Sequence, residues 1–224
     1  MTKKEEWLAG TRSAVPIMLG YVPVGIAYGV MARQAGLNTW QTVLMSLTVY
    51  GGASEMMAAG MVAQGAAVLT IVLTTFILNL RHIIMSTCVF NQMQGGRLPV
   101  RMLAAFGVTD ETFAVYTTTA NAPRTPRYFF SMALCSYLSW ALGSWLGAIA
   151  TGLLPPLITA ALGISLYAMF IGLLMPGLHG NGRLAALVVL TALCNTVLCN
   201  VVQLDSGWSM ILSTLGCAAL GHFL

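Results

Sequence analysis

Charged residues are scarce in this chain. Ten Lys or Arg and six Asp or Glu residues make up only 7% of its 224 residues, against about 25% in soluble domains. The cations are scattered through connecting segments, which argues against nucleic-acid binding. With 58% hydrophobic residues and a mean hydropathy of +0.82, the composition predicts an all-α polytopic membrane protein, because helices satisfy their own backbone hydrogen bonds in lipid.

The sequence also lacks the motifs of common enzymes and metal sites. It contains no P-loop, no HExxH and no GxSxG. Its five cysteines lie in apolar segments without a CxxC or Cys/His pattern, so disulfides and zinc are not expected. We therefore expect no enzyme activity, no cofactor, no metal and no ATP hydrolysis by this chain alone.

Apolar stretches of roughly 20 residues can cross a bilayer, and the chain has seven or eight of them. We expect spans at 14–32, 40–63, 66–90, 100–119, 128–153, 157–175, 184–202 and 208–223, within one membrane domain preceded by a cytosolic arm over residues 1–13. Two spans contain interruptions. Tyr50–Glu55 favours two half-helices, with Ser54 capping the second, and Thr109 favours a new helix that begins with Asp110 and Glu111.

The distribution of Lys and Arg in the loops favours a cytosolic N-terminus. This orientation places six cations in the cytosol (Lys3, Lys4, Arg12, Arg124, Arg127 and Arg183) and three outside (Arg33, Arg97 and Arg101). An internal repeat of three helices, one linker helix and three helices is a further possibility. It matches Gly25 and Gly29 with Gly143 and Gly147, Ser46 and Tyr50 with Ser165 and Tyr167, and Asn79 with Asn195. Chance similarity between Gly-rich helices explains this match equally well.

Arg81 is the most informative ionisable residue inside a predicted span. It lies more than ~10 Å from either end of 66–90, where a cation costs on the order of 3 kcal/mol. We expect it to pair with Glu55 or Asp110 and to line a polar cavity. The alternative is that the span ends near Leu80, so that Arg81 and His82 reach the lipid headgroups.

The glycines between Tyr50 and Glu55 have two interpretations. They either allow tight helix packing or expose backbone groups that bind a substrate, whose ammonium would meet freed carbonyls and whose carboxylate would meet freed N–H groups. Asn79 adds a neutral hydrogen-bonding group.

Four segments carry a resemblance to a known family. They are GYVPVGIAYG (Gly20–Gly29), SLTVYGGASEMM (Ser46–Met57), NLRHIIMS (Asn79–Ser86) and TDETFA (Thr109–Ala114). In this order and spacing they resemble the AzlC family, the large subunit of branched-chain amino acid exporters. The resemblance implies proton-driven efflux of leucine, isoleucine, valine or methionine across the bacterial inner membrane, and a small separate AzlD-type membrane subunit. This chain departs from the family pattern at one position, because the family more often has Gln where this chain has Glu55.

Burial and resemblance together predict a secondary active transporter for neutral amino acids. We expect the substrate site to contain Tyr50, Gly51, Gly52, Ser54, Glu55, Asn79 and Arg81, and we expect proton coupling to involve Asp110, Glu111 and His82. Two alternatives stay open: a scaffold or assembly subunit that does not transport, and a channel for small amphoteric solutes.

Overall fold

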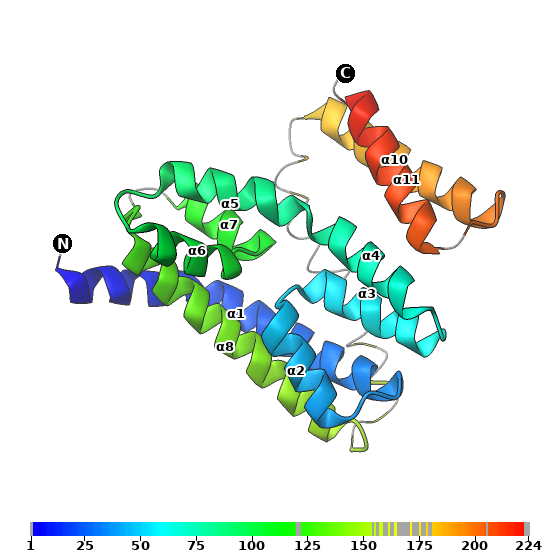
Figure 1. Cartoon of the computed structure of the whole chain (residues 1–224), viewed down its shortest axis with the longest axis horizontal. Coiled ribbons are helices and arrows are strands. Elements are labelled where there is room, and N and C mark those ends of the chain that lie inside the picture. The colour runs from blue at the N-terminus through cyan, green and yellow to red at the C-terminus, as the bar shows by residue number, and fades with distance from the viewer. Residues whose placement is uncertain are drawn as a thin grey trace. The chain divides into compact units, whose positions relative to one another are not determined.

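The computed structural model describes residues 2–119, 122–153, 181–204 and 206–221, with isolated residues between 155 and 178. Most of the expected span 157–175, with Ser165 and Tyr167 of the possible repeat, lies outside the described residues. Regular structure in the described ranges is entirely helical (Figure 1). The chain divides into one unit formed by residues 1–65 and 79–166 and a second formed by 66–78 and 167–224.

The first unit is built on two long helices, α1 (Lys3–Gln34) and α8 (Pro126–Ala150). Small residues bring them close together: a Cβ on Gly25 would lie 3.2 Å from Gly143 Cα, and one on Gly29 would lie 2.6 Å from Ala148 N. Because Gly10 similarly meets the start of α8 at Tyr128, the two helices run in the same direction. The N-terminal arm expected over 1–13 is helical from Lys3 onward, because Thr2 and Glu5 form a capping box.

Four half-helices pack against this pair. They are α2 (Thr39–Val49), α3 (Gly52–Ala63), α6 (Leu98–Phe106) and α7 (Asp110–Thr118). The breaks expected in 40–63 and 100–119 are therefore confirmed, and so is Thr109 as the N-cap of α7. At ~1.5 Å per residue, each half-helix reaches about half the thickness of a ~30 Å hydrocarbon core.

The helices α6 and α7 run in opposite directions and form a hairpin. At the base of this hairpin, Gln94 N donates to Arg124 O at 2.6 Å and Arg124 Nη2 donates to Thr117 O at 3.5 Å. At its tip, Phe106 contacts Tyr137, farther along α8, with ring centroids 5.7 Å apart. Both ends of the segment 98–118 therefore lie near the start of α8. A segment that crossed the membrane would instead have its two ends near opposite ends of α8.

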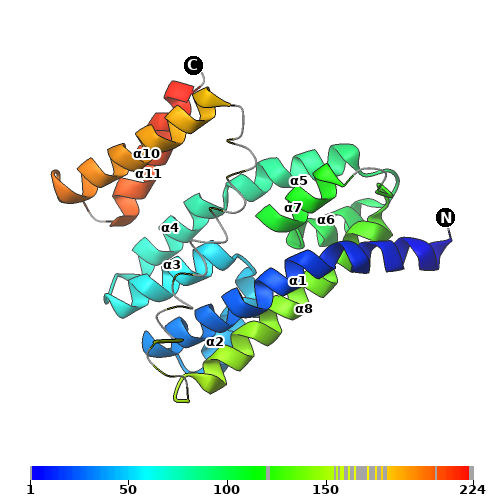
Figure 2. The same cartoon turned by 180° about the vertical axis from the view of Figure 1, so that it is seen from behind.

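The helices α2 and α3 form a second hairpin, which comes from the other end of α1. The start of α2 is fixed by Tyr28, whose hydroxyl donates to Thr42 O at 3.2 Å, and its last turn by Tyr137, which donates to Leu47 O at 2.8 Å. From Gly52, α3 leads back toward the C-terminal end of α1 (Figure 2). The tips of the two hairpins meet near the middle of α1.

The expected span 66–90 is interrupted at Leu80, where the alternative placed the end of the span, but the chain continues as a helix on both sides. It consists of α4 (Val68–Asn79) and α5 (Arg81–Gln92), separated at Leu80, which keeps helical angles of φ −55° and ψ −30°. The segment Val68–Gln92 is one of four described stretches that are long and apolar enough to cross a membrane, with α1, α8 and α10 (Gly182–Asn200).

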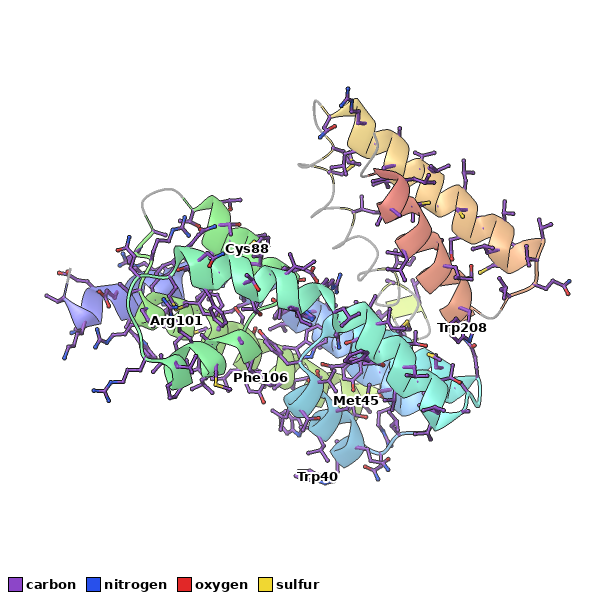
Figure 3. All side chains as sticks on the ribbon, turned by 45° about the horizontal axis from the view of Figure 1, so that its top comes forward. Trp40, Met45, Cys88, Arg101, Phe106 and Trp208 are labelled. Atoms are coloured by element: carbon purple, nitrogen blue, oxygen red, sulfur yellow. The ribbon has the colours of Figure 1, made fainter. Side chains whose placement is uncertain are left out.

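In the second unit, α10 packs against α11 (Ser206–Gly221). Ser209 Oγ donates to Asn195 Oδ1 at 2.8 Å, so Asn195 joins two helices. Large apolar side chains project from both units, including Trp40 at 70% and Trp208 at 52% exposure (Figure 3). Apolar side chains exposed in this way suit a lipid environment or a partner subunit.

Candidate functional site

Three helix breaks of the first unit meet beside the middle of α1. They are the α2–α3 break at Tyr50 and Gly51, the α4–α5 break at Leu80, and the α6–α7 break at 107–109. A Cβ on Gly51 would lie 3.5 Å from Asn79 Oδ1, so the first two breaks touch. The second and third are joined by an ion pair, in which Arg81 Nη2 lies 2.9 Å from Asp110 Oδ2.

This ion pair decides between the two partners expected for Arg81. Arg81 is the first residue of α5 and Asp110 the first of α7, so their charges meet at two helix N-termini. The side chains are 37% and 28% exposed, which leaves the pair open to water or a ligand. His82 is half-buried beside it. The guanidinium faces a carboxylate inside the unit, in contrast to the headgroup alternative.

Tyr21 on α1 links the first and third breaks. Its hydroxyl donates to Glu111 Oε2 at 2.6 Å and lies 2.7 Å from Thr109 Oγ1. Its ring packs edge-on against Tyr50, with centroids 6.4 Å apart, and against Trp140, with centroids 5.4 Å apart. Sequence reasoning missed Tyr21. The available signal was its position within GYVPVGIAYG, the first segment that carries the family resemblance.

Glu55 does not join the ion pair. Its side chain is fully buried, where Oε1 accepts from Gly51 N at 2.9 Å and Oε2 accepts from Trp140 Nε1 at 3.2 Å. The carboxyl group therefore ties the start of α3 to α8. The expected cap at Ser54 is wrong: the N-cap is Gly51, and Ser54 Oγ donates back to Gly51 O at 2.8 Å.

Tyr50 adopts a left-handed backbone conformation, with φ 47° and ψ 48°. For a residue other than glycine this costs roughly 1–2 kcal/mol. An aromatic cluster holds it in place, because its ring lies 4.9 Å from that of Tyr137 and 5.9 Å from that of Phe106. Gly52 cannot carry a side chain here, since a Cβ would lie 2.9 Å from the Trp140 ring.

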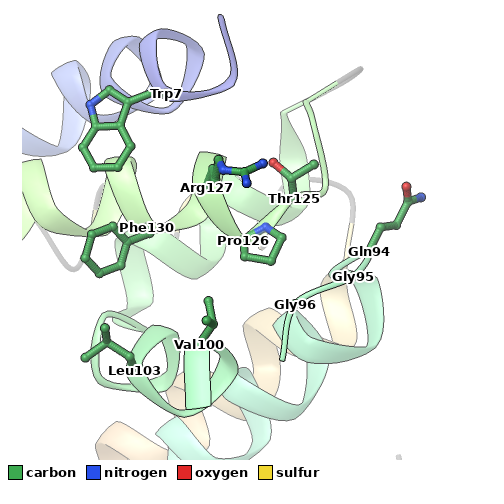
Figure 4. A pocket seen from close by; sticks show the side chains of 10 residues that line it. All are labelled: Trp7, Gln94, Gly95, Gly96, Val100, Leu103, Thr125, Pro126, Arg127 and Phe130. Carbon is green, nitrogen blue, oxygen red and sulfur yellow. The ribbon is translucent and has the colours of Figure 1, made fainter. Parts of the chain in front are cut away.

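The first unit contains one cavity beside the tips of the two hairpins and another at the base of the α6–α7 hairpin. An apolar cavity of about 240 Å³ lies beside the tips and is lined by Tyr50, Phe106, Tyr137 and their neighbours. A larger cavity of about 600 Å³ lies at the base of the α6–α7 hairpin, between Trp7, Val100, Pro126 and Phe130 (Figure 4). The smaller cavity adjoins the helix breaks and is the size of a small aliphatic group.

The structure therefore divides the predicted site residues into two groups. Tyr50, Gly51, Asn79, Arg81, Asp110 and Glu111 lie where the breaks meet, with His82 beside them. Gly52, Ser54 and Glu55 lie behind the first break, against α8 or the α3 backbone. The second group shapes the break and does not face the ion pair.

The family model for AzlC protein matches residues 16–154. The chain belongs to the AzlC family. This range covers both hairpins and all three breaks, and the finding confirms the resemblance carried by the four segments of the sequence.

Several relatives are similar over most of this AzlC-family chain. An uncharacterised membrane protein of Archaeoglobus fulgidus is 33% identical over 83% of this chain and 82% of its own length. The inner membrane protein YgaZ of Escherichia coli is 30% identical over 75% and 72%. The branched-chain amino acid transport protein AzlC of Bacillus subtilis is 27% identical over 66% and 61%. No solved structure matches the chain. These findings support a membrane transport role.

Proposed function

We propose that this chain is a secondary active transporter that exports branched-chain or similar neutral amino acids, namely leucine, isoleucine, valine or methionine. The meeting of three helix breaks beside α1 carries the proposal. Discontinuous helices form substrate sites in transporters, where the ends of half-helices point at the charged groups of the substrate. The substrate class follows the name of the Bacillus subtilis relative, and the 240 Å³ apolar cavity beside Tyr50 suits an aliphatic side chain.

The two charged groups of the amino acid bind at different places, the carboxylate at the ion pair and the ammonium at the α2–α3 break. Arg81 binds the carboxylate, since its side chain is 37% exposed and it already holds a carboxylate at 2.9 Å. The backbone carbonyl of Tyr50 and the amide oxygen of Asn79 bind the ammonium. Gly51 shapes the break beside them, because its own carbonyl already accepts from Ser54 Oγ and from Glu55 N, each at 2.8 Å. Gly52, Ser54 and Glu55 shape this part of the site from behind. Binding in this way exchanges Asp110 for the substrate as the partner of Arg81.

Proton coupling involves Asp110, Glu111 and His82 at the same junction. Protonation of a carboxyl group in a membrane removes a charge that favours one packing and so biases alternating access. A small AzlD-type membrane subunit completes the transporter in the bacterial cytoplasmic membrane. Exposed apolar side chains on α6, such as Leu98 at 70% and Met102 at 66% exposure, are compatible with such a subunit.

Reconstitution tests this proposal. The protein, alone and with the small subunit, is placed in liposomes and assayed for counterflow of labelled leucine and methionine. We expect Arg81→Ala to reduce counterflow at least tenfold, while Arg97→Ala, at an exposed position before α6, leaves it unchanged. Full transport and normal yield of Arg81→Ala would refute the assigned role.

Two further outcomes separate the alternatives. Folded protein without counterflow in either preparation favours a scaffold subunit. Transport that never runs uphill, and that does not respond to a protonophore, favours a channel.

A further inference from the structure

We propose that Tyr21 is a positioning residue for proton coupling: its hydroxyl responds to the protonation of Glu111 and sets how firmly α1 holds the tip of the α6–α7 hairpin. This inference rests on the proposed function and narrows it. It adds a residue of α1 to the coupling machinery and assigns different roles to the two adjacent acids of α7.

Asp110 and Glu111 have different partners. Asp110 lies 2.9 Å from Arg81 Nη2, and protonating it would abolish an ion pair at two helix N-termini. Glu111 has no ion pair among the described residues, and its Oε2 accepts from Tyr21 at 2.6 Å. Protonating Glu111 therefore weakens the hydrogen bond from Tyr21 and breaks no ion pair among the described residues. Glu111 can therefore be protonated and deprotonated while the ion pair between Arg81 and Asp110 stays intact.

The hydrogen bonds around Tyr21 define what a proton on Glu111 changes. Tyr21 has one hydroxyl proton and donates it to Glu111, so the 2.7 Å contact with Thr109 requires Thr109 Oγ1 to donate. Thr109 Oγ1 also accepts from Thr112 N at 3.3 Å as the cap of α7. One hydroxyl of α1 thus binds both the cap and the second residue of the half-helix.

The coupling step is one proton transfer. A proton from water on one side of the membrane forms an O–H bond on the Glu111 carboxylate, and the same bond breaks when the proton leaves to water on the other side. Charge-assisted hydrogen bonds are about twice as strong as neutral ones, so the protonated state holds the hairpin tip less firmly. Tyr21 also packs on Tyr50, and this contact carries the change to the substrate's break.

The groups that face Glu111 come from four elements. Tyr21 lies on α1 and Tyr50 at the end of α2, while Asp110 lies on α7 itself. Asp110 in turn pairs with Arg81 of α5, the residue before His82. The Arg81 charge is opposed by Asp110 at close range, which leaves the Tyr21 hydroxyl as the direct partner of Glu111.

Three variants test the inference in the reconstituted complex. Tyr21→Phe removes only the hydroxyl, and Glu111→Gln fixes a neutral side chain. Tyr128→Phe is the matched control, because its hydroxyl also joins α8 to α1, by donating to Ser13 Oγ at 2.8 Å, away from the breaks. We expect the first two to lose proton-driven accumulation about tenfold and to show a flattened pH profile of transport. Tyr128→Phe behaves as wild type.

Hydrogen exchange of the α7 amides gives a readout independent of substrate. After correction for intrinsic rates, wild-type α7 opens about tenfold more readily at low pH than at high pH, and both variants open equally at the two pH values. The inference is overturned if wild-type α7 exchange does not depend on pH, or if Tyr21→Phe matches Tyr128→Phe in both assays. Failure of the proposed function is distinct, because it appears as absent counterflow in the wild type. The hydrogen-exchange result then tests the role of the Tyr21–Glu111 hydrogen bond by itself.

Discussion

At the scale of single residues, the carboxyl group of Glu55 is buried and held by two hydrogen bonds. It is 0% exposed and its two oxygens face two N–H donors, Gly51 N and Trp140 Nε1. A carboxyl group fits these surroundings, because it offers an acceptor oxygen to each donor and both donors would otherwise be buried without a partner. This contact explains how the start of α3 is fixed although its N-cap, Gly51, has no side chain.

Glu55→Gln should therefore destabilise the protein despite its nearly identical shape. The amide NH₂ must face one of the two N–H donors, and a buried donor without a partner costs about 1–3 kcal/mol. Thermal unfolding in detergent measures the effect. Glu5→Gln is the control, since Glu5 is exposed in the capping box of α1 and Gln serves equally there. Equal midpoints for the two variants would contradict this account of Glu55.

Individual residues also show how far sequence reasoning reaches. The pairing of Arg81 with a carboxylate was predictable, because a cation deep in a span needs a nearby anion. Tyr21 was not, since a tyrosine in an apolar helix has no energetic anomaly that demands a partner. The choice between Glu55 and Asp110 also depends on which break lies against α5, and only the packed structure determines that.

At the scale of elements, the parallel packing of α1 on α8 positions both hairpins, whose helices pack against this pair. Gly25 and Gly29 of α1 face Gly143 and Gly147 of α8, with backbone atoms in direct contact. The sequence predicted these two glycine pairs as equivalent positions of a possible repeat, and the structure shows that they meet each other. Such contacts matter in lipid, where close backbone packing replaces the hydrophobic effect between helices.

Two glycines of α1 provide a matched test of this packing. A Cβ on Gly29 would overlap the α8 backbone at Ser144 and Ala148, whereas one on Gly20 meets nothing within 4 Å. Gly29→Ala should therefore destabilise the protein by about 1–3 kcal/mol through overpacking. Gly20→Ala should be neutral or stabilising by up to ~1 kcal/mol, because alanine favours helix. Unfolding midpoints measure both, and a stable Gly29→Ala protein would rule out the α1–α8 interface.

The hairpins show which features of an element are local. Breaks at 50–51 and 107–109 were predictable, because glycine pairs and an N-capping threonine act within a few residues. Reversal of direction at these breaks was not, since a half-helix that continues and one that folds back have the same local sequence. The direction is set by distant contacts, such as Gln94 with Arg124 and Phe106 with Tyr137.

At the scale of the whole molecule, the hairpins change the distribution of charge across the membrane. If 100–119 folds back, the loop with Arg97 and Arg101 lies at the same end as Arg124 and Arg127. Seven of the ten cations then share one end of the first unit, namely Lys3, Lys4, Arg12, Arg97, Arg101, Arg124 and Arg127, and Arg33 lies at the other. This asymmetry exceeds the six against three expected for uninterrupted spans, and it favours a cytosolic N-terminus more strongly.

Cysteine accessibility tests the arrangement of the whole first unit in the membrane. On a background in which the five native cysteines are replaced, we introduce Gln94→Cys, Ala122→Cys and Gln34→Cys, one at a time. An impermeant maleimide is applied to right-side-out and to inverted vesicles. Because Gln94 and Ala122 lie at the base of one hairpin, joined through the Gln94–Arg124 contact of 2.6 Å, both should react from the cytosolic side. Gln34, at the far end of α1, should react from the opposite side.

The pair of loop positions makes this experiment decisive about the hairpin as well as about orientation. A crossing segment between Gln94 and Ala122 would place them on opposite faces, so opposite labelling would show that α6 and α7 span the membrane in series. If both cysteines react from outside the cell, the hairpin is supported, but the base of the hairpin and the N-terminus lie outside rather than in the cytosol. Gln34 calibrates the two vesicle preparations, because it must differ from residues at the base of the hairpin whenever α1 crosses the bilayer once.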